Sequence, residues 1–207
     1  MKIFIFVFFF SIINASDYPN FTIQELHNIE KKSGSISKNR IIDYEQSIAL
    51  FKKYPKSKQL IQVNFYLNKL LPQYDAITQK QEDYWSTPKE FLITGYGDCE
   101  DYVIIKYFTL LKLGFKEEKL FLTTVREKYY GGYHMVLSYF KDKNKPPLIL
   151  DNLSFKILDI EKRVDLEADI FINSSGVYKI DKEYKLTKIA NNFKQYDNLK
   201  EKIKNKK

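Results

Sequence analysis

The spacing of the apolar residues along the chain changes near Gly114. Before this glycine, apolar side chains recur every three to four positions, which is the period of an amphipathic helix. The pattern predicts helices over residues 41–54, 57–71 and 98–113, and a proline or a glycine directly follows each of these segments.

Beyond Gly114, the apolar residues form short runs that are separated by turn-forming residues, which predicts β-strands. The predicted strands cover residues 120–125, 134–140, 147–150, 170–172 and 177–180. Because the helices precede the strands without strict alternation, we predict an α+β fold with an antiparallel sheet.

The first residues have the pattern of a secretory signal peptide: a positive start, an apolar run over 3–13 and then small residues. A spanning helix needs about 20 apolar residues, so this run is too short to cross a bilayer. It also lacks the polar face of the alternative, a buried N-terminal helix. We therefore predict a signal peptide at 1–16, one domain at 17–195 and a solvated Lys-rich tail at 196–207.

The composition excludes several classes of protein. The chain has 207 residues, of which 44% are hydrophobic, and a formal net charge of +8. A disordered chain, a collagen-like repeat and a multi-span membrane protein do not have this composition. Nucleic-acid-binding proteins concentrate their basic residues on one face or in a known module. Here the basic residues are dispersed outside the tail, so we predict no nucleic-acid partner.

The single cysteine is the first candidate for chemistry. Cys99 excludes an internal disulfide and a Cys-rich zinc site, because it has no second cysteine to join. It lies at the predicted start of a helix, where free N–H groups and the helix dipole lower the pKa of a thiol. An exported chain with one cysteine is expected to use it, although a buried, inert cysteine is the alternative.

Two further residues could complete a catalytic triad. His134 begins a predicted strand and Asp151 ends the next one, so pairing of these strands would bring the two side chains together. The imidazole would then exchange a proton with Cys99, and the carboxylate would orient the ring. The alternatives are a structural histidine and a strand-ending aspartate. The other histidine, His27, is predicted to lie on the surface.

Three motifs in this order resemble those of a known family. They are GDCEDY at 97–102, GYHMVL at 132–137 and LDN at 150–152, and WSTPKEFL at 85–92 resembles the usual lead-in to the cysteine. Together they resemble the bacterial transglutaminase-like cysteine peptidases, which include the LapG-type periplasmic proteases, over residues 51–155. The resemblance implies a papain/transglutaminase-like fold, with Cys99 as nucleophile, His134 as base and acid, and Asp151 as the orienting carboxylate.

Acidic residues surround the predicted nucleophile. Asp98, Glu100 and Asp101 would raise the pKa of the Cys99 thiol, and a bound divalent cation would reverse that effect. Carboxylate oxygens suit Ca²⁺. The alternative is that Asp98 caps the helix while the other two complement its dipole. The resemblance favours calcium, because LapG-type relatives depend on it, and carries the metal site to these three residues.

The resemblance also implies a biological role. Relatives clip a large surface adhesin to control attachment and biofilm release, and an inner-membrane c-di-GMP receptor sequesters them. We therefore expect a periplasmic, calcium-dependent endopeptidase that contacts the membrane only through such a receptor. The alternatives are a transglutaminase or a peptidoglycan amidase with the same triad, and a non-catalytic binding module on the same fold.

Overall fold

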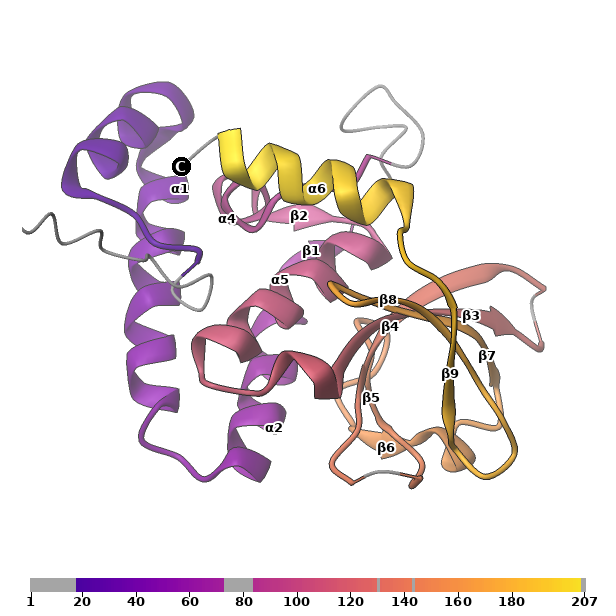
Figure 1. The fold of residues 1–207 in the computed structure, drawn as a ribbon. Helices are drawn as coiled ribbons and strands as arrows, with labels where there is room; N and C mark the ends of the chain where they lie inside the picture. The colour runs from indigo at the N-terminus through magenta and orange to yellow at the C-terminus, as the bar shows by residue number, and fades with distance from the viewer. Residues whose placement is uncertain (1–17, 73–83, 130, 143, 206–207) are drawn as a thin grey trace, which may run out of the picture.

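The computed structural model describes residues 18–72, 84–129, 131–142 and 144–205, and Figure 1 shows their arrangement. The predicted signal peptide lies outside these described residues. Within the described ranges, no helix combines the length and the apolar character that crossing a membrane requires.

Two helices form the N-terminal part of the structure. Helix α1 (Ile23–Phe51) begins with a capping box, in which Thr22 and Glu25 each accept a hydrogen bond from the other's backbone N–H. It is interrupted at Gly34, whose φ of 86° is not helical. The predicted helix at 41–54 is therefore the second half of a longer element. Helix α2 (Lys56–Leu67) is shorter than predicted, and Leu71–Pro72 forms the strand β1.

A short helix that was not predicted leads to the cysteine. Helix α4 (Pro88–Thr94) has a capping box formed by Thr87 and Glu90, and a proline at its first position. It ends at Gly95, where φ is +81° and where a Cβ atom would collide with the Arg40 guanidinium. The strand β2 (Tyr96–Gly97) follows and pairs in parallel with β1.

Helix α5 (Cys99–Lys112) is the centre of the core, as Figure 1 shows. Every residue from Glu100 to Leu110 is buried, because α2 and α4 contact one side of the helix and β3 and β4 contact the other. The structure confirms the helix predicted at 98–113. A helix that is buried all round requires apolar residues on every face, and α5 has them.

A sheet of seven antiparallel strands packs against α5, in the order β6-β5-β4-β3-β7-β8-β9. The predicted α+β fold with an antiparallel sheet is thus confirmed. Strands β6 and β9 and the two 3₁₀ helices of the described residues were not predicted. The elements are β3 (Leu120–Glu127), β4 (Tyr133–Tyr139), β5 (Leu148–Leu150), β6 (Leu158–Asp159), β7 (Leu166–Asn173), β8 (Gly176–Ile180), β9 (Leu186–Ala190), η2 (Glu117–Lys119) and η3 (Ile160–Lys162).

The C-terminal residues correct the prediction of a solvated tail. Helix α6 (Lys194–Asn205) lies across the helical side of the molecule, and Tyr196, Leu199 and Ile203 are buried in the main core. These three residues recur at helical spacing between the lysines, so the lysines occupy the outer face of an amphipathic helix. The folded domain therefore extends beyond residue 195.

Candidate functional site

Cys99 is the first residue of α5, as the sequence predicted. Asp98 occupies the N-cap position in an extended conformation, but its side chain makes no capping hydrogen bond. Gly97 lets the backbone before Asp98 pass close to the Asp101 side chain on α5. A Cβ atom at that position would lie 2.5 Å from a carboxylate oxygen of Asp101. The half-buried thiol therefore lies at the positive end of the helix dipole.

The thiol of Cys99 has two polar neighbours. It donates a hydrogen bond to a carboxylate oxygen of Glu100 at 3.1 Å, and the backbone N–H of Met135 on β4 donates to the sulfur. Burial raises the pKa of Cys99 well above its usual range, and the negative charge and acceptor oxygen of Glu100 raise it further. The Met135 N–H lowers this pKa and only partly offsets the increase. The sulfur is thus held as a protonated thiol.

The predicted contact between His134 and Asp151 is present. Leu137 pairs with Leu150, so Asp151 follows on the strand next to the one that begins near His134. Nε2 of His134 lies 2.8 Å from Oδ1 of Asp151, and both side chains are buried. Because an ionised carboxylate only accepts hydrogen bonds, Nε2 is the donor. Nδ1 is then the ring nitrogen that is available to accept a proton.

The environment of Asp151 keeps it ionised. Burial alone would raise the pKa of this carboxyl group, but the hydrogen bond and charge of His134, the N–H of Leu153 and the charge of Arg163 outweigh it. The result is a pKa of about 2. The Leu153 N–H donates to Oδ1 at 2.9 Å, and Asn68 donates to the backbone carbonyl of Asp151. Asp151 is therefore suited to orient an imidazole and to stabilise its charged form.

Arg163 is a site residue that sequence reasoning missed. Its Nη2 lies 2.8 Å from Oδ2 of Asp151 and 2.7 Å from Oδ2 of Asp165, and its side chain is 10% exposed. It follows η3, twelve residues after Asp151, with no motif around it. A buried arginine near a buried carboxylate is a common pairing, but the sequence does not show which carboxylate.

The predicted metal residues do not form a three-carboxylate cluster. Asp101 is buried and accepts hydrogen bonds from the backbone N–H and the hydroxyl of Ser86, at 2.7 and 3.0 Å. It therefore ties the lead-in segment to α5, and its role as a calcium ligand stays a prediction. In the described part of the chain, no group of three or more His, Cys, Asp or Glu residues is placed to hold a metal. Asp98 and Glu100 remain as carboxylates beside the thiol.

Lys106 is fully buried on the same helix, seven residues after Cys99. Its ammonium nitrogen has no hydrogen-bond partner among the described residues. Burial lowers the pKa of Lys106, and the negative charge of Asp151 offsets this only in part, so that the pKa is about 7. A buried lysine of this kind costs stability whenever it must be charged.

Replacing Lys106 with methionine is expected to stabilise the fold and to weaken its pH dependence. Between about pH 7 and the usual lysine pKa of 10.5, the unfolded chain binds this proton and the folded chain does not. Stability of the native protein should therefore rise with pH there, by about 1.4 kcal/mol per pH unit from this residue. Urea unfolding of both proteins at pH 7, 8 and 9 measures the difference. The exposed Lys116→Met is the control, and equal slopes for K106M and the native protein would contradict the burial effect.

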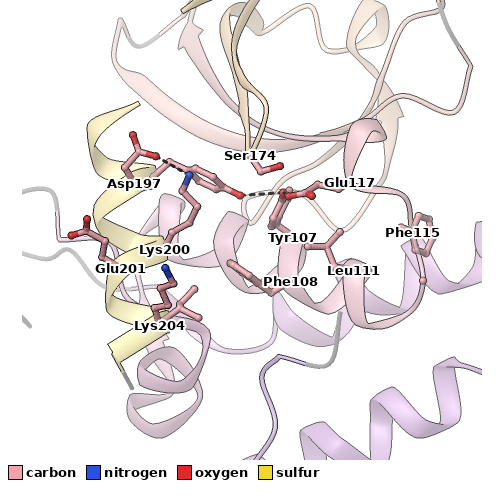
Figure 2. A pocket seen from close by; sticks show the side chains of 13 residues that line it. Tyr107, Phe108, Leu111, Phe115, Glu117, Ser174, Asp197, Lys200, Glu201 and Lys204 are labelled. Carbon is pink, nitrogen blue, oxygen red and sulfur yellow. Dashed lines mark hydrogen bonds and ion pairs between the residues drawn. The ribbon is translucent and has the colours of Figure 1, made fainter. Parts of the chain in front are cut away.

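A cavity of about 890 Å³ lies elsewhere, between α5, α6 and the β7–β8 turn. Figure 2 shows Tyr107 in its wall, donating a hydrogen bond to Glu117 at 2.7 Å, with Lys200 and Asp197 paired on α6. None of the predicted site residues lines this cavity. His27 is exposed on α1, as predicted.

Comparisons with known proteins agree with this arrangement. A family model described as bacterial transglutaminase-like cysteine proteinase BTLCP matches residues 39–164. The structure resembles Legionella pneumophila LapG in its calcium-bound form, with 31% identity, a TM-score of 0.73 and coverage of 88% of this chain and 99% of that one. No curated protein matches the chain.

Two other structures of the same Legionella protein give a similar result. The EGTA-treated form has 32% identity and a TM-score of 0.73, and covers 86% of this chain and 97% of its own. A third structure has 32% identity and a TM-score of 0.74, with 89% and 97% covered. Because the family model spans more than half of the chain and these relatives align along nearly their whole length, the chain belongs to the bacterial transglutaminase-like cysteine proteinases.

Proposed function

We propose that this protein is a cysteine endopeptidase in which Cys99, His134 and Asp151 act together on a peptide bond. The observation that carries this proposal is the buried 2.8 Å contact between His134 and Asp151, on the strands next to the cysteine-bearing end of α5. The sulfur of Cys99 contacts the N–H of Met135, the residue that follows His134. The triad would be complete once the thiol turns from Glu100 toward the ring.

The proposed reaction is acyl transfer to water. The sulfur attacks the peptide carbonyl while Nδ1 of His134 takes its proton, and backbone N–H groups at the start of α5 stabilise the oxyanion. His134 then returns the proton to the leaving amine, and water hydrolyses the thioester. Asp151 orients the ring through Nε2 and stabilises the imidazolium form, for which its low pKa suits it.

Glu100 competes with His134 for the thiol proton, which supports a role for calcium. Asp98 and Glu100 provide carboxylate oxygens of the kind that Ca²⁺ prefers, and backbone carbonyls and water would supply its other ligands. A bound Ca²⁺ would supply positive charge beside the sulfur and engage the Glu100 oxygen that now accepts the thiol proton. A calcium-bound structure of the related Legionella protein supports this assignment.

Removing calcium is expected to abolish peptide cleavage, because Glu100 then retains the thiol proton. Excess EGTA should reduce cleavage at least 10-fold, and added Ca²⁺ should restore it. Glu100→Gln should weaken Ca²⁺ binding at least 10-fold in isothermal titration calorimetry, whereas the exposed Glu118→Gln should not. Full cleavage in excess EGTA would remove calcium from the proposal.

We further propose that the substrate is a large surface adhesin, cleaved in the periplasm to release cells from a biofilm. Under this proposal, an inner-membrane c-di-GMP receptor binds the protease and controls its access to the adhesin. The support for these roles is the family membership together with the signal-peptide pattern at residues 1–16. Surface proteins released by cells with the native gene, but not with Cys99→Ala, would identify the substrate by mass spectrometry.

Incubation of the purified protein with a proteome-derived peptide library and a labelled primary amine tests the reaction type. Hydrolysis should produce new peptide termini without label. Incorporation of the amine in place of cleavage would instead indicate a transglutaminase, and cleavage of peptidoglycan fragments alone would indicate an amidase. Neither product, together with a thiol that a cysteine-directed inhibitor does not label, would indicate a non-catalytic binding module.

A further inference from the structure

The cavity between α5, α6 and the β7–β8 turn takes no part in the proposed reaction. Its volume of about 890 Å³ lies within the range of about 300–1,000 Å³ that is usual for small-molecule sites. Four aromatic side chains that line it are at most 7% exposed: Tyr107, Phe108, Phe115 and Tyr196. Lys200, Glu201 and Lys204 on α6 line it as well and are exposed. The cavity therefore has a buried aromatic wall and a solvent-exposed rim on α6.

The aromatic wall is suited to a positive charge, because the faces of aromatic rings attract cations. The ring of Tyr107 packs edge to face against Phe108, with 5.4 Å between the ring centroids, and against Tyr196, with 6.3 Å. A cation already lies over the ring of Tyr196, since Nζ of Lys200 is 5.1 Å from its centroid. A cationic group with apolar substituents could pack against several of these rings at once.

Glu117 adds a negative charge at this wall. Its side chain is half-buried and lines the cavity, and its Oε1 accepts a hydrogen bond from the Tyr107 hydroxyl at 2.7 Å. Among the residues that the structure describes, it forms no ion pair. Figure 2 shows it beyond Tyr107, whereas Lys200 and Asp197 pair with each other on α6 at 2.8 Å. Water screens the exposed lysines of the rim more than it screens a half-buried carboxylate, so the wall favours a cation.

We propose that this cavity binds a small organic cation, an ammonium group with apolar substituents, which lies against the aromatic wall with Glu117 as its counter-charge. The substituents would replace water on the rings, and the positive charge would compensate the carboxylate. A neutral molecule of the same shape would fill the volume without compensating that charge. The catalytic residues Cys99, His134 and Asp151 do not line the cavity, so the site is independent of the proposed endopeptidase function.

Choline is the probe for this site, because its trimethylammonium group is a cation with apolar substituents. Titration of the isotope-labelled native protein, followed by NMR, gives the affinity, and backbone signals of α6 and of the residues around Glu117 should shift. Choline should bind about 10-fold more tightly than dimethylbutanol, its uncharged carbon analogue. It should also bind more tightly than ethanolamine, which has the charge without the methyl groups.

Two substitutions should change the affinity for choline in opposite directions. Glu117→Gln removes the counter-charge and should weaken binding about fivefold, whereas Lys200→Gln removes the cation over Tyr196 and should strengthen binding about twofold. Glu118→Gln is the matched control and should keep the native affinity, because Glu118 is the next residue of η2, is exposed and does not line the cavity. Circular dichroism of each variant confirms that a changed affinity comes from a folded protein.

The outcomes separate the cation site from other sites and from the reaction. Equal affinities for choline and dimethylbutanol, no binding of either, or an unchanged affinity in E117Q would overturn the cation site and leave the endopeptidase function in place. Tighter binding to E117Q together with weaker binding to K200Q would also overturn it, because an anion site gives that pattern. A native protein that binds choline as expected but cleaves no peptide would overturn the endopeptidase function alone.

Discussion

Cys99→Ala is expected to abolish peptide cleavage, by roughly 10⁴-fold or more, while the fold is retained. The sulfur is the only thiol in the chain, so no other residue can form the thioester. Alanine is the best helix former and fits the half-buried first position of α5. Cleavage of the peptide library, followed by mass spectrometry, measures the activity, and a thermal melt should shift by only a few degrees.

Labelling with iodoacetamide provides a control for this variant. The native protein should take up one label per chain and lose its activity, and the C99A protein should take up none, because Cys99 is the only cysteine. A folded C99A protein that cleaves at more than about one-hundredth of the native rate would show that another residue is the nucleophile.

Arg163→Met is expected to destabilise the protein by about 3 kcal/mol and to reduce cleavage at least 10-fold. The substitution leaves Oδ2 of Asp151 buried without its cation, and breaking a buried ion pair in this way is costly. Asp151 then no longer holds His134 in one orientation. Urea unfolding gives the stability, and kcat should decrease more than the rate of thiol labelling if the effect is on the ring.

Two comparisons make the Arg163 result specific. Lys162→Met removes the neighbouring, exposed ion pair with Asp159 and should change stability by less than about 0.5 kcal/mol. A hydrogen-bonded imidazole proton of His134 should be visible by NMR in the native protein and lost in R163M, with the exposed His27 as the internal reference. An unchanged resonance together with native stability would contradict the role of Arg163.

The elements that the sequence predicts well are those in which one local signal dominates. Helix α5 has a capping position, continuous apolar residues and a terminal glycine, and its bounds agree with the prediction to within one residue. Helix α4 was missed although the Thr87–Glu90 capping box and Pro88 are visible signals, because the segment has only seven residues. Helix α6 was missed because its many lysines concealed three apolar residues at helical spacing.

In the candidate site, too, local sequence signals predict the residues at the ends of elements, but they do not predict contacts between segments that are far apart in the sequence. The sequence predicts Cys99, His134 and Asp151 as a triad because each lies at the end of a predictable element, and the structure places His134 and Asp151 in contact. Arg163 was not identified, because its partner is fixed by the path of the chain after β5. For Asp101 the sequence shows the charge, but not the two hydrogen bonds that its carboxylate accepts from Ser86 in the fold.

The hydrogen bond from Cys99 to Glu100 also affects how the protein ages. Oxidants attack the thiolate far faster than the thiol, and oxidation beyond the sulfenic acid is irreversible for most proteins. A neighbour that retains the proton therefore shields the sulfur during storage and transport, at the expense of reactivity. Under the proposed calcium binding, preparations kept in a chelator should accordingly retain their reduced thiol longer than preparations kept in calcium.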